Sequence, residues 1–283
     1  MLERTYYDPA RAQRPLTTAI WWPDTAAWAP PHPVILLSHG TGGSRFSLTW
    51  LAEALAAAGY VVAAPDHFGN STTTAQPAYF VRYWERPLDL QVLLDRLLAA
   101  YGPVLDATRV GAAGFSFGGY TVLALAGATV DWPTVQQAAQ TPAGAQAFVI
   151  PEMGDLRPLI QGLVPPSPLP ALREPRVAAV LALAPALGLG FKPAAQPQTA
   201  RAAVRLVAAA GDTLAPAATN AARYRQWVPD AEYATVAGGH YVFLPDQVGP
   251  APYFEATTGG VRTRVHEAQA AAAVRFFDRA LNR

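Results

Sequence analysis

The sequence contains no cysteine, and this absence excludes several kinds of chemistry at once. A chain without cysteine has no disulfide bond, no thiolate-bound metal and no cysteine nucleophile. The five histidines are scattered and show none of the spacings typical of metal ligands, so we expect no metal site. The lack of cysteine is also compatible with a reducing compartment.

Charged residues are scarce as well. They make up 14% of the 283 residues, against roughly a quarter in a typical soluble domain, and the formal net charge is +1. No basic patch points to a nucleic-acid partner, and there is no acidic tail. A nearly neutral surface suits a neutral or weakly charged small-molecule substrate.

Long uninterrupted apolar runs are missing too. The stretch 177–191 is interrupted by Pro185 and by glycines, and no run approaches the roughly 18 apolar residues of a membrane span. The first residues, Met-Leu-Glu-Arg-Thr-Tyr-Tyr-Asp, lack the apolar segment of a secretory signal peptide. We therefore expect a cytoplasmic protein without a membrane span.

Apolar residues, in contrast, make up 51% of the chain, in strand-like runs that alternate with helical patterns. Fully apolar runs are typical of strands that helices cover on both faces. The alternation predicts a single α/β domain over residues 1–283, with a mainly parallel central sheet flanked by helices. We expect strands at 17–22, 34–37, 60–64, 109–114, 177–183, 204–209 and 232–236, and helices at 47–58, 87–100, 118–127 and 267–281.

The segment 130–175 breaks this alternation. It is rich in Pro, Ala and Gln and includes the run Pro-Pro-Ser-Pro at 165–168. No second core follows that would need a linker, so we interpret the segment as an insertion with one or two short helices packed near the functional site. It is either a lid over a pocket or a surface excursion without a function.

The pentapeptide Gly114-Phe115-Ser116-Phe117-Gly118 lies between an expected strand and an expected helix. In this context Gly-x-Ser-x-Gly places the serine on a tight, strained turn, and the glycines leave room for the adjacent strand and helix. The helix start behind the serine also favours developing negative charge. Ser116 is therefore the predicted nucleophile.

A serine hydroxyl needs a base to take its proton and an acid to orient that base. In folds with this motif the chain order is serine, acid, histidine. His240 lies late in the chain in a glycine loop, which favours it as the base over the other histidines. Asp212 follows an apolar strand, at the sheet edge where α/β sites collect, and is the favoured acid. Asp230, in a turn before the next strand, is the alternative.

The negative charge that develops on a carbonyl oxygen needs donors aimed at it. We expect one to be the backbone N–H of Phe117, the residue after the nucleophile. The second is assigned to Thr41, in the glycine-rich loop 38–44 that follows an early strand. A phosphate-binding loop is the other interpretation of these glycines, but the segment has no lysine.

Aromatic residues flank these positions. Phe46, Tyr241 and Phe243 are predicted walls of a substrate pocket, and Trp84 and Phe191 are further candidates. A pocket of this apolar kind favours short- to medium-chain acyl esters or aromatic esters.

Five motifs together resemble a known group. They are Ser-His-Gly-Thr-Gly-Gly-Ser-Arg-Phe at 38–46, Val-Val-Ala-Ala-Pro-Asp-His at 61–67, Gly-Phe-Ser-Phe-Gly-Gly-Tyr at 114–120, Gly-Asp-Thr at 211–213 and Gly-His-Tyr at 239–241. In them the chain resembles the bacterial predicted-dienelactone-hydrolase group, which is similar to the platelet-activating-factor acetylhydrolases with an α/β-hydrolase fold. The resemblance is weakest in 130–175. It implies a serine esterase that hydrolyses carboxylic esters without a cofactor.

Two positions depart from this resemblance. Dienelactone hydrolases use a cysteine nucleophile, which this chain lacks, so their substrate is not carried over. The acetylhydrolases place their acid after the strand that follows the nucleophile helix, where this chain has Leu-Ala-Pro-Ala-Leu at 183–187. The acid must then follow the next strand, which agrees with Asp212.

The same three residues leave other functions open. A polyester hydrolase of the cutinase kind needs an open cleft, and a peptidase or amidase uses the same serine, histidine and acid. A non-catalytic ligand-binding protein on a hydrolase scaffold usually lacks one of the three, whereas here all three are present.

Overall fold

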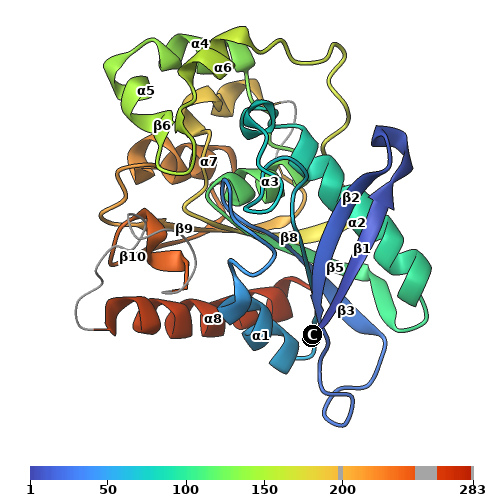
Figure 1. Ribbon diagram of the computed structural model, residues 1–283. Helices are drawn as coiled ribbons and strands as arrows, with labels where there is room; N and C mark the ends of the chain where they lie inside the picture. Colours follow the sequence, from blue (N-terminus) through green and yellow to red (C-terminus); the bar gives the residue numbers. More distant parts are fainter. Residues whose placement is uncertain (197–199, 246–259, 282–283) are drawn as a thin grey trace.

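The computed structural model describes residues 1–196, 200–245 and 260–281. Within them, eight strands form one sheet in the order β1-β2-β4-β3-β5-β8-β9-β10 (Figure 1). The strands are β1 Leu2–Asp8, β2 Arg14–Trp21, β3 His32–Ser38, β4 Val61–Pro65, β5 Leu105–Phe115, β8 Val177–Leu183, β9 Ala203–Ala209 and β10 Glu232–Val236.

The sheet is mainly parallel. From β4 to β10 every neighbouring pair is parallel, whereas β2 pairs antiparallel with β4 and β1 pairs antiparallel with β2. This confirms the fold class expected from the alternating pattern. Strand β1 escapes sequence-based prediction because most of its side chains are exposed at the edge of the sheet, where no apolar alternation is required.

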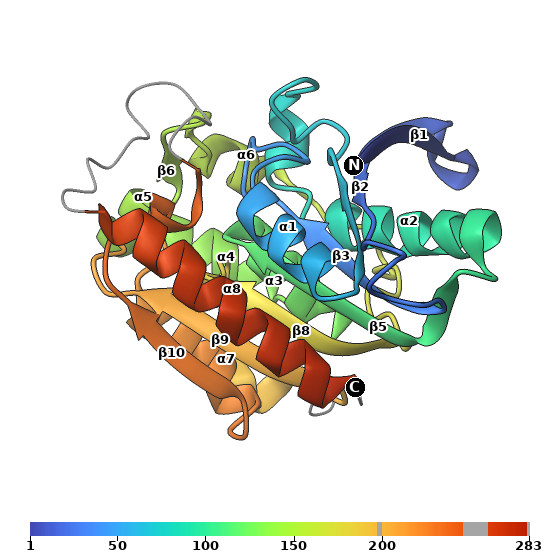
Figure 2. The same ribbon diagram turned by 90° about the horizontal axis from the view of Figure 1, so that it is seen from below.

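Helices cover both faces of this sheet (Figure 2). One face carries α1 Thr49–Ala57 and α8 Val261–Ala280, which contact each other, and the other carries α2 Glu85–Tyr101, α3 Phe117–Leu125 and α7 Ala221–Trp227. Helix α7 is not among the expected helices, and α8 begins at Val261 rather than at 267. No described helix, α8 included, is long and apolar enough to cross a membrane.

Two apolar cores follow from the alternation of side chains along the strands. In β3, Ile35 and Leu37 face α1 and α8, whereas Val34 and Leu36 face α2 and α3. All four are fully buried, and burying side chains of this size stabilises the fold by about 1.5–3 kcal/mol each. A one-residue slip of β3 would exchange the two faces, so the register of the sheet is fixed, and with it the loops at the carboxyl edge.

Between α3 and β8 the chain leaves the sheet, within the segment 130–175 where the sequence indicates an insertion. This inserted segment has three short helices rather than one or two, and a small hairpin. They are α4 Trp132–Ala139, α5 Pro142–Ala147 and α6 Arg157–Gly162, with β6 Val149–Ile150 and β7 Gly154–Asp155 in the hairpin. Its apolar residues share a third core with Tyr83, Trp84 and Tyr120. Figure 1 shows the segment on the side of the sheet that carries α3 and α7.

Candidate active site

Ser116 occupies the turn between β5 and α3. Its backbone has φ 56° and ψ −117°, a conformation that residues with a side chain rarely adopt, at a cost of about 1–3 kcal/mol. The neighbouring glycines make this turn possible. A Cβ on Gly114 would lie 2.2 Å from the carbonyl oxygen of Gly118, and a Cβ on Gly118 would lie 2.0 Å from that of Ser38. Only glycine fits at these two positions, which explains the spacing of the motif.

Ser116, His240 and Asp212 form one hydrogen-bonded chain. The Oγ of Ser116 lies 2.8 Å from Nε2 of His240, and Nδ1 of His240 lies 2.7 Å from Oδ2 of Asp212. The other carboxylate oxygen of Asp212 accepts the backbone N–H groups of Leu214 and Ala215 at 2.9 and 2.7 Å, which fixes its orientation. The side chains of Ser116, His240 and Asp212 are all buried. In this arrangement an imidazole can take the serine proton while the carboxylate stabilises the imidazolium.

The loop that carries His240 is supported from the α1 and α8 side of the sheet. Trp50 on α1 donates its indole N–H to the carbonyl of Phe243 at 2.8 Å. His266 on α8 stacks on Trp50, with ring centroids 4.4 Å apart, and its Nε2 lies 2.9 Å from the carbonyl of Val242. Two helices therefore hold the backbone that presents the imidazole to Ser116.

His39 and His67, which also lie near the carboxyl edge of the sheet, form hydrogen bonds with groups other than Ser116. His39 Nδ1 donates to the carbonyl of Gly40 at 2.7 Å, and its Nε2 accepts the backbone N–H of His67 at 3.2 Å. His67 Nδ1 donates to Asp89 at 3.0 Å, and its Nε2 accepts the hydroxyl of Ser38 at 2.9 Å. Burial lowers the pKa of both imidazoles well below the usual value, so both are neutral. Neither has a ring nitrogen left to serve as a base.

Two backbone N–H groups beside Ser116, those of Thr41 and Phe117, have no hydrogen-bond partner among the described residues. Phe117 is the first residue of α3, so its N–H carries the partial positive charge of a helix N-terminus. Thr41 follows β3 in a loop whose shape is fixed by Asn70, which accepts the Gly42 N–H at 2.9 Å. Thr41 and Phe117 line one cavity with Ser116. Free N–H groups in such a place can stabilise an oxyanion.

A buried arginine lies beneath the loop of Thr41. Arg86 on α2 is 1% exposed; it donates to the carbonyl of His39 and, at 3.3 Å, to the hydroxyl of Ser38. Its guanidinium also lies over the ring of Phe117, 4.8 Å from the centroid. Nε and Nη1 of Arg86 have no hydrogen-bond partner among the described residues. One side chain thus contacts both segments that supply the free N–H groups, and nothing in the sequence marks it.

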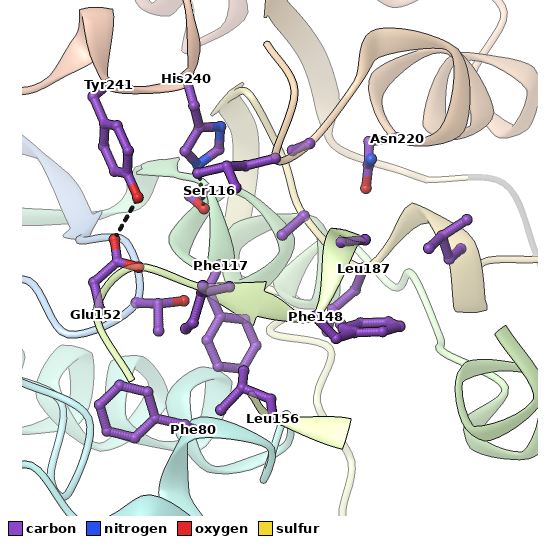
Figure 3. Close-up of a pocket in the computed structure, with 17 residues that line it drawn as sticks. Phe80, Ser116, Phe117, Phe148, Glu152, Leu156, Leu187, Asn220, His240 and Tyr241 are labelled. Carbon is purple, nitrogen blue, oxygen red and sulfur yellow. Dashed lines mark hydrogen bonds between the residues drawn. The ribbon is translucent and has the colours of Figure 1, made fainter. Parts of the chain in front are cut away.

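Ser116 and His240 open onto a cavity of about 90 Å³, which we call the serine cavity. Figure 3 shows aromatic and aliphatic side chains around it, several of them from the inserted segment. Its apolar walls include Phe80, Phe117, Phe148, Ile150, Leu156, Leu187, Leu189 and Leu214. The site is therefore a small, mostly apolar space with a polar cluster at the serine.

The predicted pocket walls divide into three groups. Tyr241 lines the serine cavity, and Phe46 lines a second, larger cavity beside it. Phe243 is fully buried against Phe115 and lines neither cavity. Trp84 and Phe191 are buried in cores and line neither cavity.

The two candidate acids lie in different places. Asp212 contacts His240, whereas Asp230 is exposed in the turn before β10. Among the described residues, no group of three or more His, Cys, Asp or Glu side chains could hold a metal ion.

Glu152, in the hairpin of the inserted segment, is a carboxylate in these apolar surroundings. Its Oε1 accepts the hydroxyl of Tyr241 at 2.9 Å, the contact drawn as a dashed line beside His240 and Ser116 in Figure 3. Burial raises the pKa of Glu152 above the usual value, and hydrogen bonds from its own backbone N–H and from Tyr241, together with the charge of His240, oppose this rise. No motif points to Glu152, because it lies in the segment whose sequence shows no periodicity.

Comparison with known proteins agrees with this architecture. The model of the dienelactone hydrolase family matches residues 19–141. A ferulic acid esterase from Streptomyces cinnamoneus is similar in structure, with 20% identity and a TM-score of 0.57, over 99% of this chain and 88% of its own. An alpha-beta serine hydrolase homologue from Coxiella burnetii has 14% identity and a TM-score of 0.56, over 96% of both chains. No curated protein matches the sequence significantly.

The family match covers the strands and loops that bring Thr41 and Ser116 together, and the structural similarity extends over nearly the whole chain. Together with the strand order and the strained turn at Ser116, these similarities show that the chain has the α/β-hydrolase fold.

Proposed function

We propose that the protein is a serine carboxylesterase that works through an acyl-enzyme. The observation that carries this proposal is the chain of short contacts from Ser116 Oγ through His240 to Asp212, at 2.8 and 2.7 Å. Two free backbone N–H groups lie beside it. A nucleophile, an oriented base and donors for an oxyanion are the parts that acyl transfer requires. The family match and the similar hydrolase structures support a hydrolase.

In the first half of the reaction, Ser116 Oγ attacks the ester carbonyl carbon while His240 Nε2 takes the hydroxyl proton. The carbonyl oxygen becomes negatively charged and accepts hydrogen bonds from the N–H groups of Thr41 and Phe117. Asp212 stabilises the imidazolium. When the bond to the alcohol oxygen breaks, His240 returns its proton to the departing alcohol, and the acyl group remains on Ser116.

In the second half, water takes the place of the alcohol. His240 removes a proton from the water as its oxygen attacks the acyl carbonyl, and the same two N–H groups hold the second oxyanion. Collapse of this intermediate breaks the bond to Ser116 Oγ, which regains the proton from His240. The carboxylic acid is released and the enzyme is restored without any cofactor.

The serine cavity favours short acyl groups. Its volume of about 90 Å³ lies well below the roughly 300–1,000 Å³ that is typical of sites for larger small molecules. A long acyl chain needs several times this space, so within the range of esters suited to an apolar pocket we favour the short-chain end. Longer chains would require displacement of the inserted segment, which forms part of the wall as a lid would.

The direct test uses Ser116→Ala with p-nitrophenyl acetate and a fluorophosphonate probe. The wild-type enzyme is expected to hydrolyse the ester with a burst of p-nitrophenol and to be labelled on Ser116. The variant should show neither, because Ser116 is the hydroxyl that lies within hydrogen-bond distance of His240 Nε2 among the described residues. Ser167→Ala is the matched control, since Ser167 is exposed and lines neither cavity. Burst kinetics that persist in Ser116→Ala would refute the proposal.

A paired ester and amide of the same short acid distinguishes an esterase from an amidase. We expect the ester to be the faster substrate, because the alkoxide leaves more readily than an amine and the site offers the amine no separate acid besides His240.

A further inference from the structure

A second cavity of about 600 Å³ lies beside the serine cavity, and we call it the large cavity. Its volume is in the range of small-molecule binding sites, which the serine cavity by itself does not reach. The two cavities share four wall residues, Thr41, Phe80, Glu152 and Tyr241. The hydrogen-bonded pair of Glu152 and Tyr241 therefore stands at the boundary between them.

Glu152 is held firmly at this boundary. Its Oε1 accepts the Tyr241 hydroxyl at 2.9 Å, and its Cβ would lie 3.2 Å from a Cβ placed on Gly42. The hairpin of the inserted segment therefore packs on the loop of Thr41. The carboxylate also interacts with the backbone N–H of Glu152 itself, and an ionised carboxylate has about four acceptor positions, so these two contacts leave some of them open. A ligand that spans the two cavities passes a carboxylate with free acceptor capacity.

The large cavity is lined by hydroxyl groups, glycine backbone and aromatic rings. The hydroxyls are those of Thr41, Ser44, Ser47, Ser71, Thr72 and Thr73. Some of these hydroxyls already donate within the protein, Thr72 to the carbonyls of Gly42 and Gly43 and Thr73 to Asp66, but a hydroxyl that donates can still accept. The rings of Phe46, Phe80 and Phe115 offer apolar faces. This mixture suits a compact ligand that has several hydroxyl groups on an apolar carbon frame.

Charge at the large cavity disfavours an anionic ligand. The one cationic side chain among its described wall residues, Arg45, is already paired with Asp66 at 2.6 Å and with Glu3 at 2.7 Å. Glu152 carries the opposing sign. A carboxylate or phosphate would thus meet a carboxylate and no free cation, whereas a hydroxyl can donate to Glu152 in the ionised state.

We propose that the large cavity binds the alcohol part of the ester and that this alcohol is a polyol, selected by a hydrogen bond to Glu152. The inference rests on the proposed esterase function. The acyl group occupies the small cavity that holds Ser116, and the larger alcohol extends past Glu152. His240 protonates the alcohol oxygen when its bond to the acyl carbon breaks, and the polyol then leaves from the large cavity before water attacks.

The test compares three acetate esters whose alcohols have the same six-membered ring. They are the monoacetate of inositol, cyclohexyl acetate, and the acetate of a hydroxycyclohexanecarboxylate. For the wild-type enzyme we expect kcat/KM to be at least tenfold higher for the inositol ester than for cyclohexyl acetate, about what one hydrogen bond to a charged group supports. The carboxylated ester should be the poorest of the three.

Two variants assign the selection to Glu152. Glu152→Leu removes both oxygens, so the ratio of kcat/KM for the inositol ester to kcat/KM for cyclohexyl acetate should fall about tenfold. Glu152→Gln keeps the volume and removes the charge, so the carboxylated ester should gain relative to cyclohexyl acetate. Asp155→Asn, in the same hairpin but exposed and outside both cavities, is the matched control and should leave all ratios unchanged.

The outcomes separate this proposal from the esterase function. Equal rates on the inositol and cyclohexyl esters, or a preference that survives Glu152→Leu, would overturn the polyol assignment although the enzyme is active. If Glu152→Leu does not fold, as judged from its thermal unfolding, the carboxylated-ester ratio of Glu152→Gln decides. Failure of the esterase function itself would appear as no cleavage of any acetate and no fluorophosphonate labelling of Ser116.

Discussion

Replacing Arg86 by methionine should weaken both the fold and the reaction. The change keeps an unbranched side chain of similar length and removes the guanidinium. The carbonyl of His39 then loses its donor, the hydroxyl of Ser38 loses one of its contacts, and the ring of Phe117 loses the cation above it. These contacts hold the two segments that carry the free N–H groups of Thr41 and Phe117.

The magnitude follows from burial. Arg86 is 1% exposed, and Asp89 is the carboxylate that interacts with its charge. Removing one partner from a buried ionic network typically costs about 3–5 kcal/mol, because polar groups are left without compensation. For a protein of this size each kcal/mol corresponds to about 2–4 °C, so the midpoint of thermal unfolding should fall by about 6–20 °C.

The effect on activity should appear in kcat. Losing a whole oxyanion donor costs about 10²–10³-fold in kcat in serine hydrolases. Because Arg86→Met displaces the loop without deleting a donor, we expect a smaller loss, about 10-fold to 100-fold, with little change in KM. Arg86→Lys should recover part of the stability and less of kcat, because lysine restores the charge but not the planar group.

The measurement pairs differential scanning calorimetry with steady-state kinetics on p-nitrophenyl acetate below the unfolding transition. Arg96→Met is the control, since Arg96 lies exposed on the same helix, α2. The reasoning is refuted if Arg86→Met unfolds at the wild-type temperature and retains the wild-type kcat.

Three further predictions concern other parts of the site. Asp212→Asn should lower kcat by about 10⁴-fold with an intact fold, because the amide cannot stabilise the imidazolium; an active variant would contradict the role of Asp212. Gly118→Ala should give little folded protein in a thermal-shift assay, because its Cβ would lie 2.0 Å from the carbonyl of Ser38; a stable variant would show that the turn can relax. Burial lowers the pKa of His266 to about 4, so the unfolded chain takes up a proton near pH 6.5 while the folded protein does so only near pH 4. Stability attributable to His266 is therefore lost as the pH falls from 6.5 to 4, and His266→Phe should flatten the decline of the unfolding temperature over this interval; an unchanged slope would exclude His266 as its source.

The central part of the fold is predictable from the sequence because each buried strand requires a run of apolar residues. The apolar runs in β3, β8, β9 and the second half of β5 are typical of strands that helices cover on both faces. Strand β1 and helix α7 have no comparable apolar pattern, because an edge strand and a short half-exposed helix need few apolar residues.

The residues at Ser116 are predictable for a related reason. The glycines of the motif are needed because a Cβ at either position would lie 2.0 or 2.2 Å from a backbone carbonyl oxygen. Asp212 and His240 follow strand ends whose position the sheet fixes. Glu152 and Arg86 reach the site through tertiary packing alone, from an insertion without periodicity and from the buried face of α2, so no local pattern reveals them. Phe243 shows the reverse error: it is near His240 in sequence, but it points into the core.

The support of His240 by Trp50 and His266 has a consequence for how such a protein changes over generations. The base is anchored from one face of the sheet, and the inserted segment on the other face supplies part of the wall of the serine cavity. Mutations in 130–175 can therefore reshape what is accepted while the proton-transfer machinery is inherited intact. The hydrogen bond between Tyr241 and Glu152 connects the loop of His240 to the inserted segment. A lineage that acquires a new substrate should change position 152 before it changes positions 50 or 266.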